Sequence, residues 1–226
     1  MKKCFSLVFI FFWGCPVEDM ILLDNSTWIS REAIEEIAAS CDIPPGTYMI
    51  TYTSDVFYAS EIPVKKVIIL TSDGPMVIGE GDTLTMEMEG RLLAFFLDIY
   101  PNDNYGEGVL RMEGDGSVYF LTVSGVYNVL NVGDYVEYFS AVRISPGDYV
   151  LSFSSDLESG EREIKRVLLY NTTDNDPYGW FWVLNEGEEK EITVTGEGLD
   201  AEYLYGTVIA TEEPSGRGEV RIERLP

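Results

Sequence analysis

Bulky apolar and polar residues alternate in several short segments of this chain. In residues 48–53, YMITYT, the alternation places Tyr48, Ile50 and Tyr52 on one face of an extended segment. The same pattern recurs in three further segments, at residues 84–89, 149–154 and 191–195. Gly, Pro, Asp and Asn separate these segments at short intervals. The pattern is typical of strands with one buried face, and it predicts an all-β fold of antiparallel sandwiches.

One of these segments belongs to a longer motif that occurs twice. Residues 43–55, IPPGTYMITYTSD, resemble residues 144–156, ISPGDYVLSFSSD, and a Pro-Gly turn precedes the strand in both. Four further blocks recur in the same order, pairing residues 64–69 with 164–169, 80–82 with 186–188, 86–90 with 192–196, and 108–113 with 218–223. The sequence therefore predicts an internal duplication. We expect two tandem antiparallel β-sandwich domains, at residues 29–124 and 125–226, with a jelly-roll-like topology as one form for each.

Residues 30–40, SREAIEEIAAS, carry a different signal. They are rich in helix-forming residues, and Ser30 is a candidate N-cap. The equivalent segment of the second copy, residues 135–141, is strand-like in composition. Propensity thus predicts a helix where the repeat predicts a strand, and we favour a short helix.

The N-terminus has the organisation of an export signal. Two lysines precede a short apolar stretch at residues 5–13, and a Gly-Cys pair ending at Cys15 follows directly. The stretch is too short to span a bilayer. Residues 1–15 resemble a bacterial lipoprotein signal, which implies cleavage before Cys15 and lipidation of its thiol. An ordinary secretory signal and a membrane-retained start are the alternatives, and all three place the body outside the cytoplasm. We expect residues 16–28 to form a tether.

The charge of the chain narrows its partners. Asp and Glu number 39 against 15 Lys and Arg, which gives a formal net charge of −24. Nucleic acids and anionic membrane surfaces attract positive proteins, so we expect neither as a partner, and contact with a membrane only through a lipid anchor. The acidic residues are spread over both copies, which favours a solubility role, with cation binding as the alternative. The chain contains no His, the commonest general base and transition-metal ligand.

Positions that differ between the copies are the better functional candidates, because the shared fold does not require them. The second copy contains NTTDNDPYGWFW at residues 171–182 where the first copy is shorter and lacks Trp. Tyr178, Trp180 and Trp182 could form an exposed stacking platform for sugar rings or for another protein. The alternative is that these aromatic residues fill the core or the seam between the domains.

The first copy contains a polar loop of its own at residues 98–107, DIYPNDNYGE. Oxygen atoms of Asp98, Asn102, Asp103 and Glu107 could surround a hard cation, which makes Ca²⁺ the one cofactor that we consider. The spacing does not match an EF-hand, and Asp and Asn are also ordinary turn residues.

No catalytic set emerges from the sequence. There is no His to activate a Ser, no phosphate-binding glycine loop and no Cys pair for a metal, and carboxylates are too numerous for any pair to be informative. The Pro-Gly turn followed by alternating strands is similar to carbohydrate-binding modules and other secreted jelly rolls. We therefore expect a non-catalytic extracytoplasmic binding module on the cell surface, with a glycan or an envelope protein as its ligand. A structural spacer of the cell envelope is the alternative, and a hydrolase ranks last.

Overall fold

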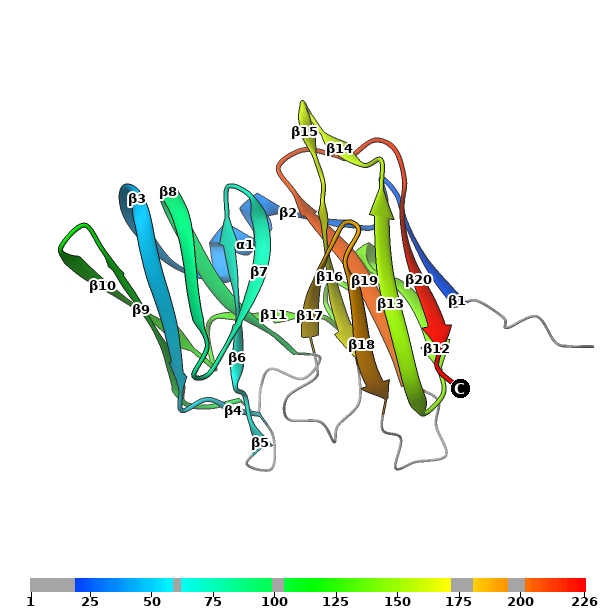
Figure 1. The fold of residues 1–226 in the computed structure, drawn as a ribbon, viewed down its shortest axis with the longest axis horizontal. Helices are drawn as coiled ribbons and strands as arrows, with labels where there is room; N and C mark the ends of the chain where they lie inside the picture. Colours follow the sequence, from blue (N-terminus) through cyan, green and yellow to red (C-terminus); the bar gives the residue numbers. More distant parts are fainter. Residues whose placement is uncertain (1–18, 59–61, 99–103, 172–180, 195–201) are drawn as a thin grey trace, which may run out of the picture.

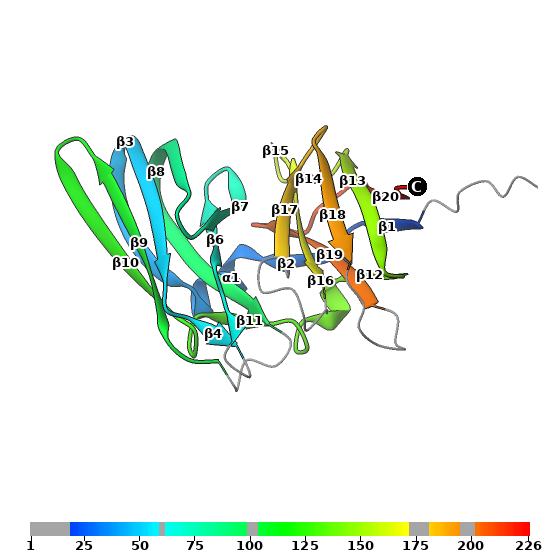
Figure 2. The same cartoon turned by 60° about the horizontal axis from the view of Figure 1, so that its bottom comes forward.

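The structure, a computed structural model, describes residues 19–58, 62–98, 104–171, 181–194 and 202–226. Within these residues the fold is all-β, with twenty strands and a single α-helix. The strands form two halves that stand side by side (Figure 1 and Figure 2). The chain is therefore an all-β sandwich protein, as the alternation predicts.

The first half is one continuous sheet with the order β10-β9-β3-β8-β6-β7, and β11 pairs with β8 in parallel. Its strands are β3 (Ala39–Ser54), β6 (Lys66–Thr71), β7 (Gly74–Gly79), β8 (Thr83–Asp98), β9 (Glu107–Gly114), β10 (Ser117–Ser124) and β11 (Val129–Asn131), with a small ribbon of β4 (Phe57–Tyr58) and β5 (Ile62–Pro63). The long strands β3 and β8 contain a register shift between Ile43 and Gly46 and a glycine with positive φ at Gly90. Irregularities of this kind let a long strand bend, so that its two ends can pack on opposite sides of the same core.

The second half uses two sheets, with the orders β1-β20-β13-β18 and β12-β19-β16-β17. Its strands are β12 (Ser140–Ile144), β13 (Gly147–Ser155), β16 (Arg166–Asn171), β17 (Phe181–Asn185), β18 (Glu189–Val194), β19 (Glu202–Ala210) and β20 (Gly218–Arg224), with a ribbon of β14 (Glu158–Ser159) and β15 (Arg162–Glu163). By its pairings, β3 of the first half corresponds to β12 and β13 together, and β8 to β18 and β19. The second half has the same plan with its two long strands interrupted.

Hydrogen bonds repeat at matching positions of the two halves. Gly81 N donates to Tyr52 O at 3.4 Å, and Gly187 N donates to Phe153 O at 3.0 Å. The motif tyrosine makes the same contact in each copy, from its hydroxyl to the carbonyl four residues before it. These shared contacts are what the predicted duplication would produce, and the duplication itself stays a prediction.

The N-terminal segment corrects the predicted domain boundaries. β1 (Asp19–Leu23) pairs with β20, and β2 (Trp28–Ser30) pairs with β19, so both strands belong to the second half (Figure 1). The expected tether at residues 16–28 is therefore wrong over its described part, because Ile21 and Leu23 alternate into the core of the second half. In the same way β11, placed by sequence in the second domain, pairs with the first half.

The helix at the entrance of the first copy is confirmed. α1 spans Arg31–Ile37, and the Ser30 side chain caps it by accepting a hydrogen bond from Ala33 N at 3.1 Å. The strand expected at the equivalent residues 135–141 is wrong in part, because a 3₁₀ turn, η3 (Val136–Tyr138), comes before β12.

Three apolar clusters hold the molecule together, one inside each half and one at the seam between the halves. β6 and β16 each contribute alternate residues to their own core and to the seam, so both are buried on both faces. The seam cluster consists of Ile29, Ile34, Ile68, Leu70, Leu93, Phe95, Leu97, Leu130, Val132, Phe139, Leu168, Tyr170, Phe181 and Ile209. The two halves are thus joined through a buried apolar interface.

Candidate ligand-binding site

A groove lies between the two halves, beyond the apolar seam. It consists of two adjoining pockets of about 90 Å³ and about 320 Å³, and Arg166 and Pro75 line both. The smaller pocket is bounded by residues 70–75 of the first half, by residues 159, 162–166 and 209–211 of the second, and by Arg31. The larger pocket lies between the β6–β7 and β16–β17 hairpins.

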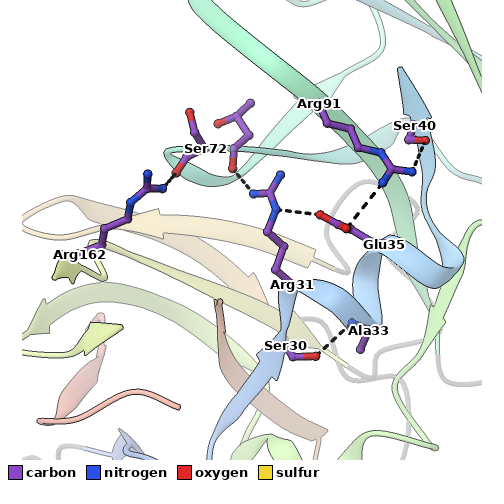
Figure 3. A network of polar contacts seen from close by, with 9 residues as sticks. Ser30, Arg31, Ala33, Glu35, Ser40, Ser72, Arg91 and Arg162 are labelled. Atoms are coloured by element: carbon purple, nitrogen blue, oxygen red, sulfur yellow. Dashed lines mark hydrogen bonds and ion pairs between the residues drawn. The ribbon is translucent and has the colours of Figure 1, made fainter. Parts of the chain in front are cut away.

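Three arginines converge on the turn between β6 and β7. Arg31 Nη1 donates to Thr71 O at 2.8 Å, Arg162 Nη1 to Ser72 O at 3.4 Å, and Arg166 Nη1 to Pro75 O at 3.4 Å. The contacts of the first two are visible in Figure 3. All three guanidiniums therefore bind carbonyl oxygens of one turn, residues 71–75, from outside the first half's sheet.

These arginines differ in how firmly they are held. Arg31 also pairs with Glu35 at 3.2 Å, and Glu35 in turn pairs with Arg91 at 3.7 Å (Figure 3). In the described part of the chain, no carboxylate lies within ion-pair distance of Arg162 or Arg166. Arg166 is oriented instead by a hydrogen bond from Nε to the side chain of Asn185 at 3.1 Å. Within the described residues, the positive charges of Arg162 and Arg166 are therefore not neutralised by an acidic side chain.

The charge of the groove is opposite to that of the whole chain. Six of the fifteen basic residues line it but only four of the 39 acidic residues, a formal surplus of two positive charges. The remaining nine basic and 35 acidic residues carry −26. The basic residues are Arg31, Lys66, Arg162, Lys165, Arg166 and Lys190, and the acidic ones are Asp73, Asp82, Glu163 and Glu188. The groove thus has a positive net charge in a negatively charged molecule, which favours ligands that carry negative charge.

One ion pair lies within the groove. Lys165 Nζ lies 2.6 Å from a carboxylate oxygen of Glu163. The hydrogen bond between them lowers the pKa of Glu163 and raises the pKa of Lys165. Both groups therefore stay charged near neutral pH and largely satisfy each other, which leaves Arg162 and Arg166 as the more available cations.

The larger pocket has matching walls. In the strand registers, Lys66 lies opposite Gly79 as Arg166 lies opposite Asn185, and Ile69 lies opposite Met76 as Leu169 lies opposite Trp182. The first wall therefore presents Lys66 at the position where the second presents Arg166. A basic residue on each wall follows from the repeated blocks at residues 64–69 and 164–169.

Of the predicted aromatic platform, the structure describes only Trp182, which lines the larger pocket, so its part in ligand binding stays a prediction. Trp182 is only 8 % exposed and packs into the core of the second half, at the position that Met76 occupies in the first. Residues alternate along β17, so Phe181 faces the seam and Trp182 faces the core. Tyr178 and Trp180 lie outside the described residues.

The predicted cation site stays a prediction, because two of its four residues are not described; among the described residues, no three acidic or thiol side chains form a group that could hold a metal. Asp98 is buried at the end of β8, and Glu107 is exposed at the start of β9. Asn102, Asp103 and the predicted lipidation site Cys15 lie outside the described residues.

Sequence reasoning did not identify Arg31, Arg162 or Arg166 as site residues. The available signal was the basic pair that recurs at residues 65–66 and 165–166, which we used only to align the two copies. Nothing in the alignment indicates that the two pairs lie on facing hairpins. In the described residues, no helix is both long and apolar enough to cross a membrane.

Comparisons with known proteins identify no family. No family model matches the chain, and no curated protein matches it. Two solved structures are distantly similar, each at 10 % sequence identity. The secreted serine protease VesC from Vibrio cholerae has a TM-score of 0.25 over 86 % of this chain and 52 % of that one. A cupin 2 conserved barrel domain protein from Leptotrichia buccalis has a TM-score of 0.17 over 83 % and 78 %. The chain thus spans about half of VesC. Scores this low carry no argument about function.

Proposed function

We propose that the protein is a non-catalytic binding module that works outside the cytoplasm, and that the groove between its two halves is the ligand site. The observation that carries the proposal is the charge of the groove: six basic residues gather there in a chain of net charge −24. Guanidinium groups keep their protons at neutral pH, so they bind and orient a ligand rather than exchange protons with it. This favours binding over catalysis.

The size of the groove supports a small or narrow ligand. Ligand pockets in proteins are typically about 300–1,000 Å³, and the larger pocket lies at the lower end of this range. The walls of the larger pocket belong mainly to two hairpins, β6–β7 and β16–β17, which the seam cluster holds together. A site on such elements is preformed, and binding then costs little ordering of the protein.

Amide hydrogen exchange of the full-length protein tests this site without a mutation. A ligand is first selected from a glycan array and from extracts of envelope proteins, and exchange is then compared with and without it. We expect protection at residues 72–79 and 162–166, at the two walls of the groove. No ligand in either screen, or protection confined to the far strands β9 and β10, would contradict the proposal.

We further propose that the protein is anchored through lipidated Cys15. The support is the basic, apolar and Gly-Cys sequence of residues 1–15. Labelling with a radioactive fatty acid in a bacterial host measures the modification directly. We expect label in the wild-type protein and none in Cys15→Ser, and equal labelling of the two would refute the anchor.

A structural spacer in the envelope is the second candidate function. The observation in its favour is the apolar seam, which joins the halves by fourteen buried residues and would keep a spacer stiff. A spacer should form stable complexes with envelope components, which co-purification after cross-linking measures. Such complexes, formed equally well by a variant with a blocked groove, would favour the spacer over the binding module.

A further inference from the structure

We infer that the groove recognises anionic groups and that its ligand is an acidic oligosaccharide, one that carries carboxylates or sulfates on successive units. This inference rests on the proposed function and names its ligand class. Outside the groove the chain carries −26, which repels an acidic ligand from most of the surface. The groove is therefore the place where such a ligand is attracted.

Arg162 and Arg166 are the groups best prepared to bind an oxyanion. Their contacts with Ser72 O and Pro75 O are both 3.4 Å long, whereas a good N–H···O hydrogen bond is about 2.9–3.0 Å. The acceptors are neutral carbonyls, and a carboxylate or sulfate oxygen would be a stronger acceptor for a guanidinium. An incoming anion can thus replace two weak contacts without separating an ion pair.

The other two cations of the smaller pocket have different roles. Arg31 donates to Thr71 O at 2.8 Å and pairs with Glu35, which fixes it against the turn. Lys165 is held by Glu163 at 2.6 Å. Both of these cations are paired with an acid, so Arg162 and Arg166 supply the charge and the directed hydrogen bonds of the smaller pocket.

The distribution of charge favours an oligosaccharide over a free anion. Basic residues line both pockets: Arg162 and Arg166 the smaller one, and Lys66, Arg166 and Lys190 the larger one. A single sulfate or phosphate ion would contact the basic residues of only one of the two pockets. A chain of acidic sugars presents charges at intervals and is narrow enough for the groove, whereas a folded protein surface would not enter it.

Isothermal titration of the full-length protein tests the inference with oligogalacturonate as the acidic probe and a neutral galactose oligomer of equal length as its control. We expect binding of the acidic probe, weakening with added salt, and no binding of the neutral one. Arg162→Gln with Arg166→Gln should weaken binding about tenfold or more, because each removes a charged hydrogen bond. Arg166→Lys keeps the charge but loses the paired donors of the guanidinium. Its affinity for the acidic probe should lie between those of wild type and the double variant.

Arg111→Gln is the control for each single charge removed, since it makes one Arg→Gln change on β9, which β3 and β8 separate from β6. We expect it to bind within about twofold of wild type, apart from the long-range effect of one charge. Thermal unfolding verifies that each variant is folded. Arg166→Lys and Lys66→Gln provide the test if the double variant does not fold.

The possible failures separate the inference from the proposed function. A neutral glycan that protects the groove and is insensitive to Arg162 and Arg166 would overturn the anionic ligand and leave the binding module. Inorganic sulfate binding as tightly as the oligomer would overturn the oligosaccharide. An acidic protein that competes for the groove, with no glycan bound, would do the same. No ligand of any class at the groove would overturn both.

Discussion

The N-terminal strand β1 offers a direct test of the architecture. Ile21 lies opposite Val220 and Leu23 lies opposite Gly218, and both point into the core of the second half with exposures of 0 % and 1 %. Leu22, between them, is 59 % exposed. We expect Ile21→Ala and Leu23→Ala to destabilise the protein strongly, and Leu22→Ala to have little effect.

The magnitudes follow from the burial of each side chain. Truncating a fully buried Ile or Leu to Ala costs about 2–5 kcal/mol, from lost burial and from the cavity that remains. That is a large part of the roughly 5–15 kcal/mol by which domains are stable. An exposed substitution such as Leu22→Ala usually changes stability by less than about 0.5 kcal/mol. The three variants lie in one strand, so any difference in stability between them reports which face of the strand each side chain occupies.

Urea unfolding followed by tryptophan fluorescence measures the three free energies, and an unchanged slope with urea would indicate that the unfolding transition itself is the same. If all three variants were neutral, residues 19–23 would be the tether that the sequence suggests, and the strand would not form. If Leu22→Ala were costly and the other two variants were nearly neutral, the register of β1 on β20 would be wrong by one residue.

Three further outcomes are expected. Gly106→Ala should cost more than Gly116→Ala: both have positive φ, which alone costs about 1–2 kcal/mol, but an added Cβ at Gly106 would also collide with Asp55 O. Urea midpoints compare the two. Burial raises the pKa of Tyr52 above the ordinary tyrosine value of about 10, so stability is intact below that pH and falls above it by up to about 1.4 kcal/mol per pH unit. Tyr52→Phe should lessen this alkaline loss, measured as unfolding free energy against pH. Ser30→Ala removes the cap of α1 and should cost about 1 kcal/mol in the same assay, and no change would refute the cap.

Local pattern was sufficient for the strands and for much of the core. Tyr48, Ile50 and Tyr52, placed on one face by alternation, are all buried in the core of the first half. The short helix was also within reach, because Ser30 provides a local cap that the equivalent segment of the second copy lacks. Where the cap and the repeat disagreed, the cap was the better guide, since it acts within one turn of chain.

The sequence does not predict which strands pair when they are far apart in the chain. β1 joins the second half through contacts almost 200 residues away in the chain, and its four apolar residues in succession do not indicate a partner. For Trp182 the sequence left both an exposed platform and the core open, because the pattern does not say which face of the strand meets the core. Arg162 and Arg166 were missed for the same reason, because they form a site only where the two halves meet.

The seam itself follows from a feature that the two copies share. β6, KVIILT, and β16, RVLLYN, are continuous apolar runs between their first and last residues, and each is buried on both faces. A sandwich needs only one apolar face from such a strand, so the second face of each must be covered by something else. Each half covers the other, with Ile68 and Leu70 meeting Leu168 and Tyr170 in one cluster. Neither half is therefore a separate module, and a groove whose walls are the two facing hairpins exists only in the joined pair.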